Sequence, residues 1–348
     1  MAQKIHELAQ TKGTFQVRGV VSEMQKETAY QEIETKNGNT MRRLKFAVSP
    51  DGKGKIFLEL TAFPKSDVYF YSKDEKKTIK VPFANRNKPQ AEGYNLIGIN
   101  LGLEKVVDKK GKAINKKITL CEYDATMYIF EHMADGDEVF INGDIEFSSQ
   151  NTDDGVKRYH KLIPKQISLL SQPLDFTAED FVSHAYFSQQ VIKKDIVKNE
   201  EKQGEFVFQT NVVNYSSIED VEFTVKNSKL AQTLKKNVKP YTSLVVTGSL
   251  YQEPISEQVE VEDDWGEVDH MSRINSFSPM QFLITGAKKE TLDTETYTKE
   301  SVTTAQRLIQ EWGANKITEQ ANGTAKSNKA VDDDEDWGAE IDDEEIPF

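Results

Sequence analysis

The chain has 348 residues, a single cysteine and a formal net charge of −13, and this length suits about two domains. One cysteine excludes an intramolecular disulfide framework, and no apolar run approaches the roughly 18 residues that a membrane span needs. The first residues also lack the apolar core of a signal peptide. We therefore expect a soluble cytoplasmic protein without a membrane segment.

The negative charge is unevenly distributed along the chain. Residues 331–348 contain ten acids, and residues 257–269 contain seven more, without a Lys or Arg in either run. The remaining residues carry a formal net charge of +4. A mildly basic body with acidic appendages is typical of a nucleic-acid binder.

The first half of the chain predicts a small β domain. Runs rich in β-branched and aromatic residues predict strands at 13–21, 42–48, 55–63, 138–147 and 157–170. A short helix is predicted at 122–133, between the third and fourth of these strands. This order is that of an OB-fold, a five-stranded Greek-key barrel, although another small barrel or sandwich stays open.

Residues 65–120 interrupt this order as a large excursion with one or two hairpins. The segment holds thirteen Lys and Arg against six Asp and Glu, with tyrosines at 69, 71 and 94 between them. Its composition indicates a basic insertion that carries exposed aromatic side chains.

The same sequence of elements occurs a second time. Strands are predicted at 181–196, 205–213, 220–225, 243–251 and 280–286, with a helix at 228–238 before the fourth strand. We therefore predict a mainly β protein with two tandem OB-fold-like five-stranded barrels, short helices and a disordered acidic C-terminal tail. The predicted domains are 1–172 with the insertion at 65–120, 173–290 with the acidic loop at 257–269, a helical segment at 291–313, and a disordered linker and tail at 314–348.

The motifs of common enzyme classes are missing from the sequence. It has no phosphate-binding G-x-x-x-x-G-K-[ST] loop and no dinucleotide fingerprint, and its five histidines show no metal-ligand spacing. We therefore expect no catalytic residue, no metal and no cofactor, and a protein that is not an enzyme.

Binding of a single strand without sequence preference needs cations for the backbone and aromatic faces for the bases. The first unit offers both on its outward strand positions and its insertion. The candidate DNA-binding residues are Arg18, Arg43, Lys45, Phe57, Phe63, Tyr69, Tyr71, Lys80, Arg86, Tyr94, Arg158 and Tyr159. The second unit, with Phe187 and Lys193 among its candidates, is expected to bind weakly or to pack against the first.

The end of the chain combines acids with an apolar tip. A block of like charge this dense is expected to stay extended, whereas the final apolar residues suit docking into a pocket of a partner protein. The predicted partner-binding residues are Asp342, Asp343, Glu344, Glu345, Ile346, Pro347 and Phe348.

This ending resembles the C-terminal tip of bacterial single-stranded DNA-binding proteins, in which a few acids precede Ile-Pro-Phe. The resemblance implies coating of single-stranded DNA and recruitment of replication, recombination and repair proteins through the tip. The usual bacterial form has one shorter barrel per chain, so the longer body suggests a phage- or plasmid-encoded version in a bacterial cell or infected host.

Two other functions stay open at this point. An OB-fold protein adaptor of the replication machinery would share the tail but would not bind single strands in a salt-dependent way. A DNA-mimicking inhibitor of a DNA enzyme would use the acids, but it would leave the basic insertion without a purpose.

Overall fold

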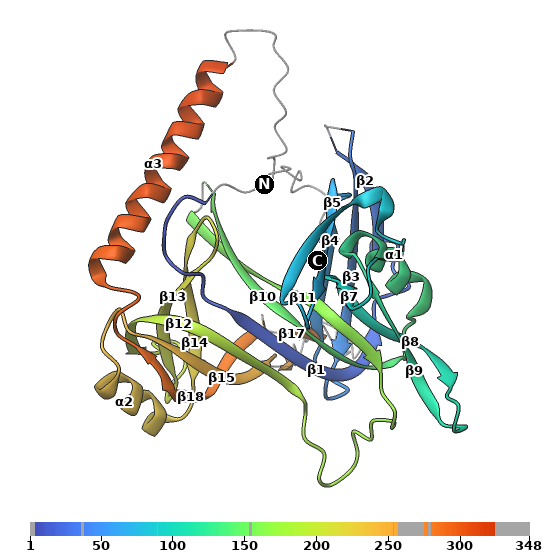
Figure 1. The fold of residues 1–348 in the computed structure, drawn as a ribbon. Coiled ribbons are helices and arrows are strands. Elements are labelled where there is room, and N and C mark those ends of the chain that lie inside the picture. The colour runs from blue at the N-terminus through green and yellow to red at the C-terminus, as the bar shows by residue number, and fades with distance from the viewer. Residues whose placement is uncertain are drawn as a thin grey trace, which may run out of the picture.

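The computed structural model describes residues 4–35, 38–88, 90–152, 155–252, 254–256, 275–277 and 280–323. The protein is mainly β, and Figure 1 shows two groups of strands side by side with α3 (Lys299–Gly323) standing out from one of them. The predicted tail and acidic loop lie outside the described residues.

The first group of strands follows the predicted order. It consists of β1 (Gly13–Ser22), β2 (Tyr30–Glu34), β3 (Thr40–Ser49), β4 (Ile56–Ala62), α1 (Glu122–His132), β10 (Glu138–Thr152) and β11 (Gly155–Leu169). Strands β1 and β4 alternate buried and more exposed side chains, and β3 contributes Leu44, Phe46 and Val48 to the same core. The predicted strands and the helix are confirmed, and β2 is an additional strand that the sequence did not indicate.

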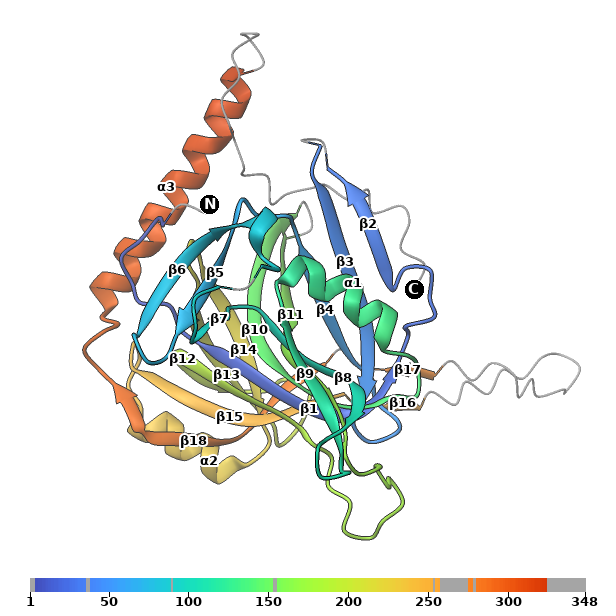
Figure 2. The ribbon, with the colours of Figure 1, turned by 45° about the vertical axis from the view of Figure 1, so that its right-hand side comes forward.

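The insertion forms a separate small sheet and a hairpin that joins the main sheet at β11. Its first part is a three-stranded sheet in the order β6-β5-β7, and the second is a hairpin of β8 and β9. Their bounds are β5 (Asp67–Ser72), β6 (Lys77–Pro82), the 3-10 turn η1 (Phe83–Asn85), β7 (Tyr94–Leu96), β8 (Ile99–Val107) and β9 (Ala113–Leu120). Figure 2 shows the small sheet in front of the main sheet and the hairpin projecting below it.

The second group repeats the arrangement. It consists of β12 (Ala185–Lys198), β13 (Phe206–Val213), β14 (Ile218–Val225), α2 (Ser228–Asn237), β15 (Ser243–Tyr251), β16 (Pro254–Ser256), β17 (Asn275–Phe277) and β18 (Gln281–Asp293). Strands β12, β13, β14, β18 and β15 pair in that order, and β15 pairs back with β12, which closes the cycle. The β14–β18 contact is parallel and the other pairings are antiparallel.

One glycine environment occurs in both groups. Gly143 in β10 pairs with Phe15, and a Cβ there would lie 1.9 Å from the carbonyl oxygen of Ile163. Gly248 in β15 pairs with Phe187, and its Cβ would lie 1.9 Å from the carbonyl oxygen of Leu283. Each glycine also lies at a register shift in its strand pair. The backbones therefore approach too closely for any side chain at either position.

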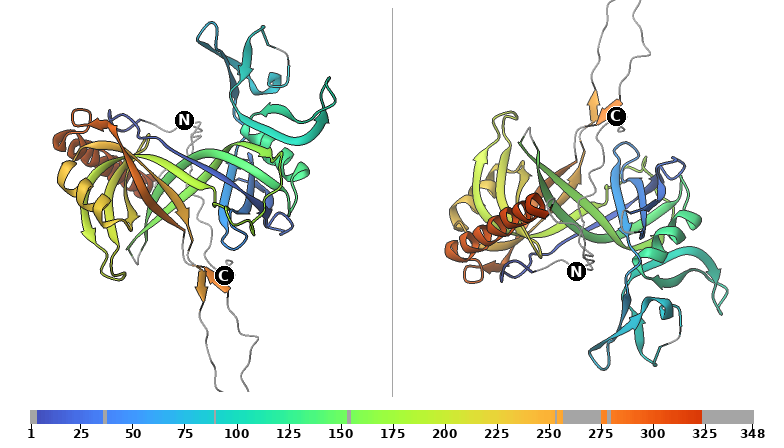
Figure 3. Two further views of the ribbon diagram at one scale, coloured as in Figure 1. Left: turned by 90° about the horizontal axis from the view of Figure 1, so that it is seen from below. Right: turned by 90° about the horizontal axis from the view of Figure 1, so that it is seen from above.

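The two groups are joined by their first strands. Strand β1 pairs antiparallel with β12, and the equivalent residues Phe15 and Phe187 lie opposite each other. Because equivalent positions meet in an antiparallel pair, the two groups are related by an approximate two-fold arrangement. Figure 3 shows the two groups side by side, seen from below and from above. The sheet and the main apolar core both continue from one group into the other.

The helix α3 is anchored at its start. Tyr297 is buried beside Val302 and Ala305, and its hydroxyl donates to the carbonyl oxygen of Ala9 at 2.9 Å. The helix continues to Gly323, so residues 314–323, which the sequence predicts as the start of the linker, are helical here. Alanine, glutamate, glutamine and lysine favour helix, and no proline interrupts them.

Candidate nucleic-acid interface

The small sheet of the insertion has one covered face and one open face. Val68, Phe70 and Val81 point into a separate core, as alternation along β5 and β6 requires. Tyr69 and Tyr71 point the other way and are 40% and 37% exposed. Lys80 lies opposite Tyr69, and its ammonium contacts Asp67 at 2.9 Å. Two phenol rings therefore share an open face with a cation at its side.

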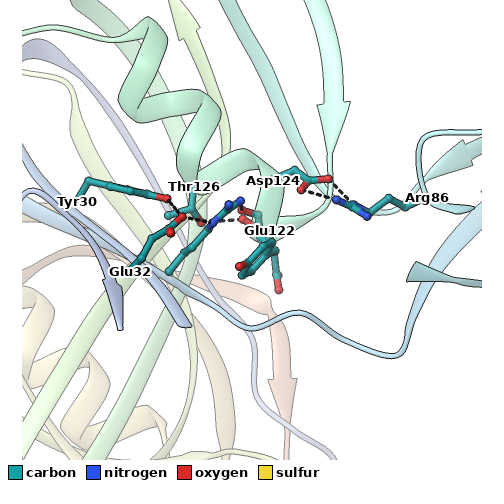
Figure 4. Close-up of polar contacts among 8 residues, drawn as sticks. Tyr30, Glu32, Arg86, Glu122, Asp124 and Thr126 are labelled. Atoms are coloured by element: carbon teal, nitrogen blue, oxygen red, sulfur yellow. Dashed lines mark hydrogen bonds and ion pairs between the residues drawn. The ribbon is translucent and has the colours of Figure 1, made fainter. Parts of the chain in front are cut away.

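This sheet is held on the first turn of α1. Cys121 and Tyr123 complete its core, and Arg86 bridges to Asp124 through Nε–Oδ2 and Nη2–Oδ1 bonds of 2.5 and 3.0 Å (Figure 4). The guanidinium of Arg86 also lies 3.8 Å from the ring centroid of Phe83. Burial opposes ionisation of Asp124, but the Arg86 bonds outweigh it, so the pKa of this carboxyl lies below its usual value.

A second ion-pair set lies on the same turn. Glu122 accepts from Lys65 at 3.1 Å and from Lys165 at 2.9 Å, which ties the start of the insertion to β11. Burial alone would raise the pKa of Glu122, but the two ammonium groups together have the larger, opposite effect. The pKa of Glu122 therefore lies below its usual value. Lys65 and Arg86 thus attach the beginning and the middle of the insertion to the first turn of α1.

The outer face of β3 and β4 carries the second aromatic candidate. Phe57 is 58% exposed, next to a shallow pocket that Lys45, Glu59 and Lys161 also line. Glu59 lies 3.3 Å from Lys45 and 3.1 Å from Lys161. Burial opposes the ionisation of Glu59, but the two lysines hold its pKa below the usual value. Two cations share one carboxylate, which leaves a net positive charge beside the ring.

The arm formed by β10 and β11 continues from this pocket toward the second group. A second pocket, which shares His160 with the first, is lined by Arg158 and Tyr159 on one side. Its other side belongs to β14, where the acids Glu219, Asp220 and Glu222 lie. The positive surface therefore ends at an acidic wall.

The remaining candidates are engaged elsewhere. Arg18 lies on the outer face of β1, with its guanidinium 5.7 Å from the ring centroid of Phe140. Arg43 donates to the amide oxygen of Gln31, and the Tyr94 hydroxyl donates to Glu75 at 2.8 Å. Phe63 is half-buried after the end of β4. The structure thus brings Tyr69, Tyr71 and Lys80 together, Lys45 and Phe57 together, and Arg158 and Tyr159 together.

Two residues expected on the surface of the second group are buried. Phe187 belongs to the main core, and Lys193 is only 3% exposed. The Lys193 ammonium donates to the carbonyl oxygens of Leu234, Lys235 and Val238, where α2 ends. The surface interpretation of these two residues is wrong, because Phe187 faces inward on β12 and Lys193 satisfies helix carbonyls that lack backbone donors.

One exposed residue was not predicted from the sequence. Ile97 is 56% exposed, and its amide donates to the carbonyl oxygen of Tyr69 at 2.8 Å. An isolated isoleucine in an irregular segment gives no periodic signal for the face it occupies.

Neither a metal-binding group nor a membrane-spanning helix occurs among the described residues. Across them, no three His, Cys, Asp or Glu side chains gather as a metal-binding group. Within the same residues, no helix is long and apolar enough to cross a membrane. The predicted partner-binding residues 342–348 lie outside this part of the chain.

Comparison with known proteins gives one family and two solved structures. The protein-family model described as YorF matches residues 12–323. A deletion mutant of the single-stranded DNA-binding protein from Thermus aquaticus is 12% identical with a TM-score of 0.37, covering 81% of this chain and 95% of its own. The wild-type protein is 10% identical with a TM-score of 0.37, covering 80% and 93%. No curated protein matches the chain.

Proposed function

The chain belongs to the YorF family, and we propose that it is a non-enzymatic protein that binds single-stranded DNA without sequence preference. The observation that carries this proposal is the open face of the small sheet. There Tyr69 and Tyr71 are exposed on one strand, with Lys80 opposite the first of them.

The chemistry of that face suits an unpaired strand. Residues two apart on a strand lie roughly 6.6 Å apart, so each ring can hold its own base. Stacking on an aromatic side chain is worth about 1–3 kcal/mol per base and accepts every base, since each has a π-face. A duplex hides those faces, so the surface favours single strands.

We propose that the bound single-stranded DNA continues from the small sheet over the outer face of β4 and along the β10–β11 arm. Phe57 offers a third ring, and Lys45, Lys161 and Arg158 offer cations for phosphates. The acids on β14 repel phosphate at the far side of the second pocket. The first group is therefore the binding unit, and the second mainly packs against it.

We propose that each group is an OB-fold barrel. Support comes from the closed pairing cycle of the second group, with α2 between its third and fourth strands. This is the strand order of a five-stranded Greek-key barrel. The repeated glycine environment at Gly143 and Gly248 supports the same assignment for the first group.

We propose that the last residues recruit partners to the coated strand. Support comes from the sequence, where four acids at 342–345 precede Ile346, Pro347 and Phe348. The partners would be replication, recombination and repair proteins in the cytoplasm of a bacterial cell or an infected host, with the gene carried by a phage or plasmid.

The binding proposal is tested by fluorescence anisotropy with two labelled probes of equal length, oligo-dT and a blunt duplex. The full chain is expected to bind oligo-dT at least about tenfold more tightly, which corresponds to roughly 1.4 kcal/mol and is within the range of a single base stack. Equal binding to both probes would overturn the proposal, because the aromatic face would then have no role.

A further inference from the structure

The β8–β9 hairpin has a buried root and an exposed tip. Ile99, Leu101 and Leu103 are buried in the main core, whereas every residue of β8 after Glu104 is exposed. In Figure 2 the hairpin extends away from both groups of strands. Among the described residues, no other element covers the outer half of the hairpin.

The root of the hairpin is fixed in place. Strand β8 pairs in parallel with β11, and the side-chain amide of Asn115 donates to the carbonyl oxygen of Leu169 at 2.6 Å. Glu104 accepts from the hydroxyl of Tyr128 on α1 at 2.7 Å and from Lys116 at 2.8 Å. The hairpin is therefore held at a set angle to the body.

The turn at its end is also well defined. The Asp108 carboxylate accepts from the amides of Lys110 and Lys112 at 2.8 and 2.9 Å. Gly111 supplies the positive φ of 77° that the turn requires. A tip braced in this way presents its side chains in one arrangement.

The side chains of the tip combine aliphatic groups with lysines. Val107 is 71% exposed and Ile114 is 43% exposed, and they lie on opposite faces because Ile114 pairs with Val106. The lysines of the hairpin are Lys105, Lys109, Lys110, Lys112, Lys116 and Lys117. Among the described residues, only Lys116 of these six forms an ion pair, with Glu104. Such a tip suits an anionic partner that also accepts apolar contact.

We propose that this tip is a wedge that enters the junction between single-stranded and duplex DNA. Aliphatic side chains offer no ring for stacking, but branched apolar groups inserted between base steps are a known means of unstacking them. The lysines around the tip suit the phosphates of the two separating strands. The inference rests on the proposed function, since it places a junction next to the bound single strand.

The position of the hairpin favours nucleic acid over an anionic membrane. Strand β8 begins three residues after β7 ends, so the wedge continues directly from the sheet that carries Tyr69 and Tyr71. Single-stranded DNA stacked on that sheet would reach the hairpin without crossing the second group. A membrane partner would leave this continuity unexplained.

The test compares oligo-dT with a forked duplex whose single-stranded arm has the same length. The double variant Val107→Ser/Ile114→Ser removes the two most exposed aliphatic side chains of the tip, one on each face, and keeps all six lysines. Val182→Ser is the matched control, because Val182 is also 71% exposed but lies in the segment between β11 and β12.

The wild-type chain is expected to prefer the fork by about tenfold, the effect of one modest apolar anchor. The double variant is expected to lose that preference while its oligo-dT affinity stays within about twofold, and Val182→Ser is expected to change neither. No fork preference in the wild type, or an equal loss on both probes, would overturn the wedge. In both cases wild-type binding to oligo-dT would leave the proposed function standing.

A binding experiment with lipid vesicles distinguishes DNA from an anionic membrane as the partner of the tip. Anionic phosphatidylserine vesicles are expected to bind the wild type and the double variant equally. Vesicle binding that the variant loses, with fork affinity unchanged, would assign the tip to a membrane and overturn the inference.

Discussion

Tyr69 and Tyr71 hold their rings in solvent because their sheet is covered on one face only. Val68, Phe70 and Val81 fill that covered face, so the alternating residues of β5 have no core to enter. Exposing two large rings is unfavourable in water, which is why we assign them a ligand.

Replacing these tyrosines tests the assignment at the residue scale. Each of Tyr69→Ala and Tyr71→Ala is expected to weaken oligo-dT binding by about 1–3 kcal/mol, the worth of one base stack. The measurement is anisotropy at fixed salt. Tyr215→Ala is the control, because Tyr215 is similarly exposed on the second group. Equal losses in all three variants would contradict a stacking role for the small sheet.

Asp124 makes a prediction about pH and stability. Because its folded pKa is lowered, its contribution is full above the unfolded value of about 3.9 and is lost as pH falls through the folded pKa. Asp124→Asn is expected to lower the free energy of unfolding at pH 7 by about 1–3 kcal/mol. The difference from wild type should shrink below roughly pH 4.

Urea denaturation at a series of pH values measures this effect. Asp74→Asn is the control, since Asp74 is exposed in the same insertion and forms no ion pair among the described residues. The series extends to about pH 2.5, roughly 1.4 units below the unfolded pKa of Asp. A loss of unfolding free energy in Asp124→Asn that stays constant over this whole range would contradict the contribution of the Arg86 bridge.

Residue type and alternation were enough to predict some side-chain positions and not others. Phe57 was predicted as outward from alternation along its strand, and Tyr69 was predicted as exposed from the basic and aromatic composition of the insertion. The partners of Arg86 and Lys193 are about 40 residues away in sequence. Local patterns contain no information about such contacts, so a strand lysine whose ammonium caps a distant helix end cannot be distinguished from a surface lysine.

At the scale of the elements, two strands depend on glycine for their approach. A Cβ at Gly143 or Gly248 would meet a carbonyl oxygen at 1.9 Å, and neither backbone can move without opening its pairing. Gly143→Ala and Gly248→Ala are each expected to lower the free energy of unfolding by about 1–3 kcal/mol or more. Thermal denaturation followed by circular dichroism measures this change.

Gly313→Ala is the matched control for these substitutions. Gly313 lies in α3, and a Cβ added there would have no atom within 4 Å outside its own helix turn, so alanine is expected to be neutral or to stabilise by up to about 1 kcal/mol. Destabilisation at Gly143 but not at Gly248 would contradict the equivalence of the two groups.

At this scale, both helices predicted within the strand order were found. The helix at 122–133 and the helix at 228–238 match α1 and α2, and Asn227 caps α2 by accepting from the amide of Leu230. Strand β2 was not predicted, because its five residues contain two acids and a glutamine and gain their structure from pairing with β3. The polar end of β10 was missed for the same reason, since β11 supplies its partners.

At the scale of the whole molecule, the decisive contact is the pairing of β1 with β12. It joins positions about 170 residues apart and sets the relation between the two groups. No local pattern predicts such a pairing, whereas the repeat of elements that makes it two-fold was visible in the sequence. The charge distribution was also visible, with a basic insertion and acidic appendages.

The tip of the chain makes a separate prediction. Removing Phe348 is expected to leave oligo-dT affinity within about twofold, because the binding face lies on the first group. It is expected to abolish capture of purified replication and repair enzymes by the protein bound to immobilised oligo-dT. A loss of DNA binding on this change would show that the tip supports the binding face instead.

The most direct test of the central claim is the salt dependence of oligo-dT binding by the full chain. If Lys45, Lys80, Arg158 and Lys161 each neutralise one phosphate, log K falls with log salt at a slope of about −2.8. Affinity should then drop roughly fiftyfold between 50 and 200 mM salt. Absent binding, or binding indifferent to salt, would contradict single-strand binding and favour an adaptor that contacts proteins.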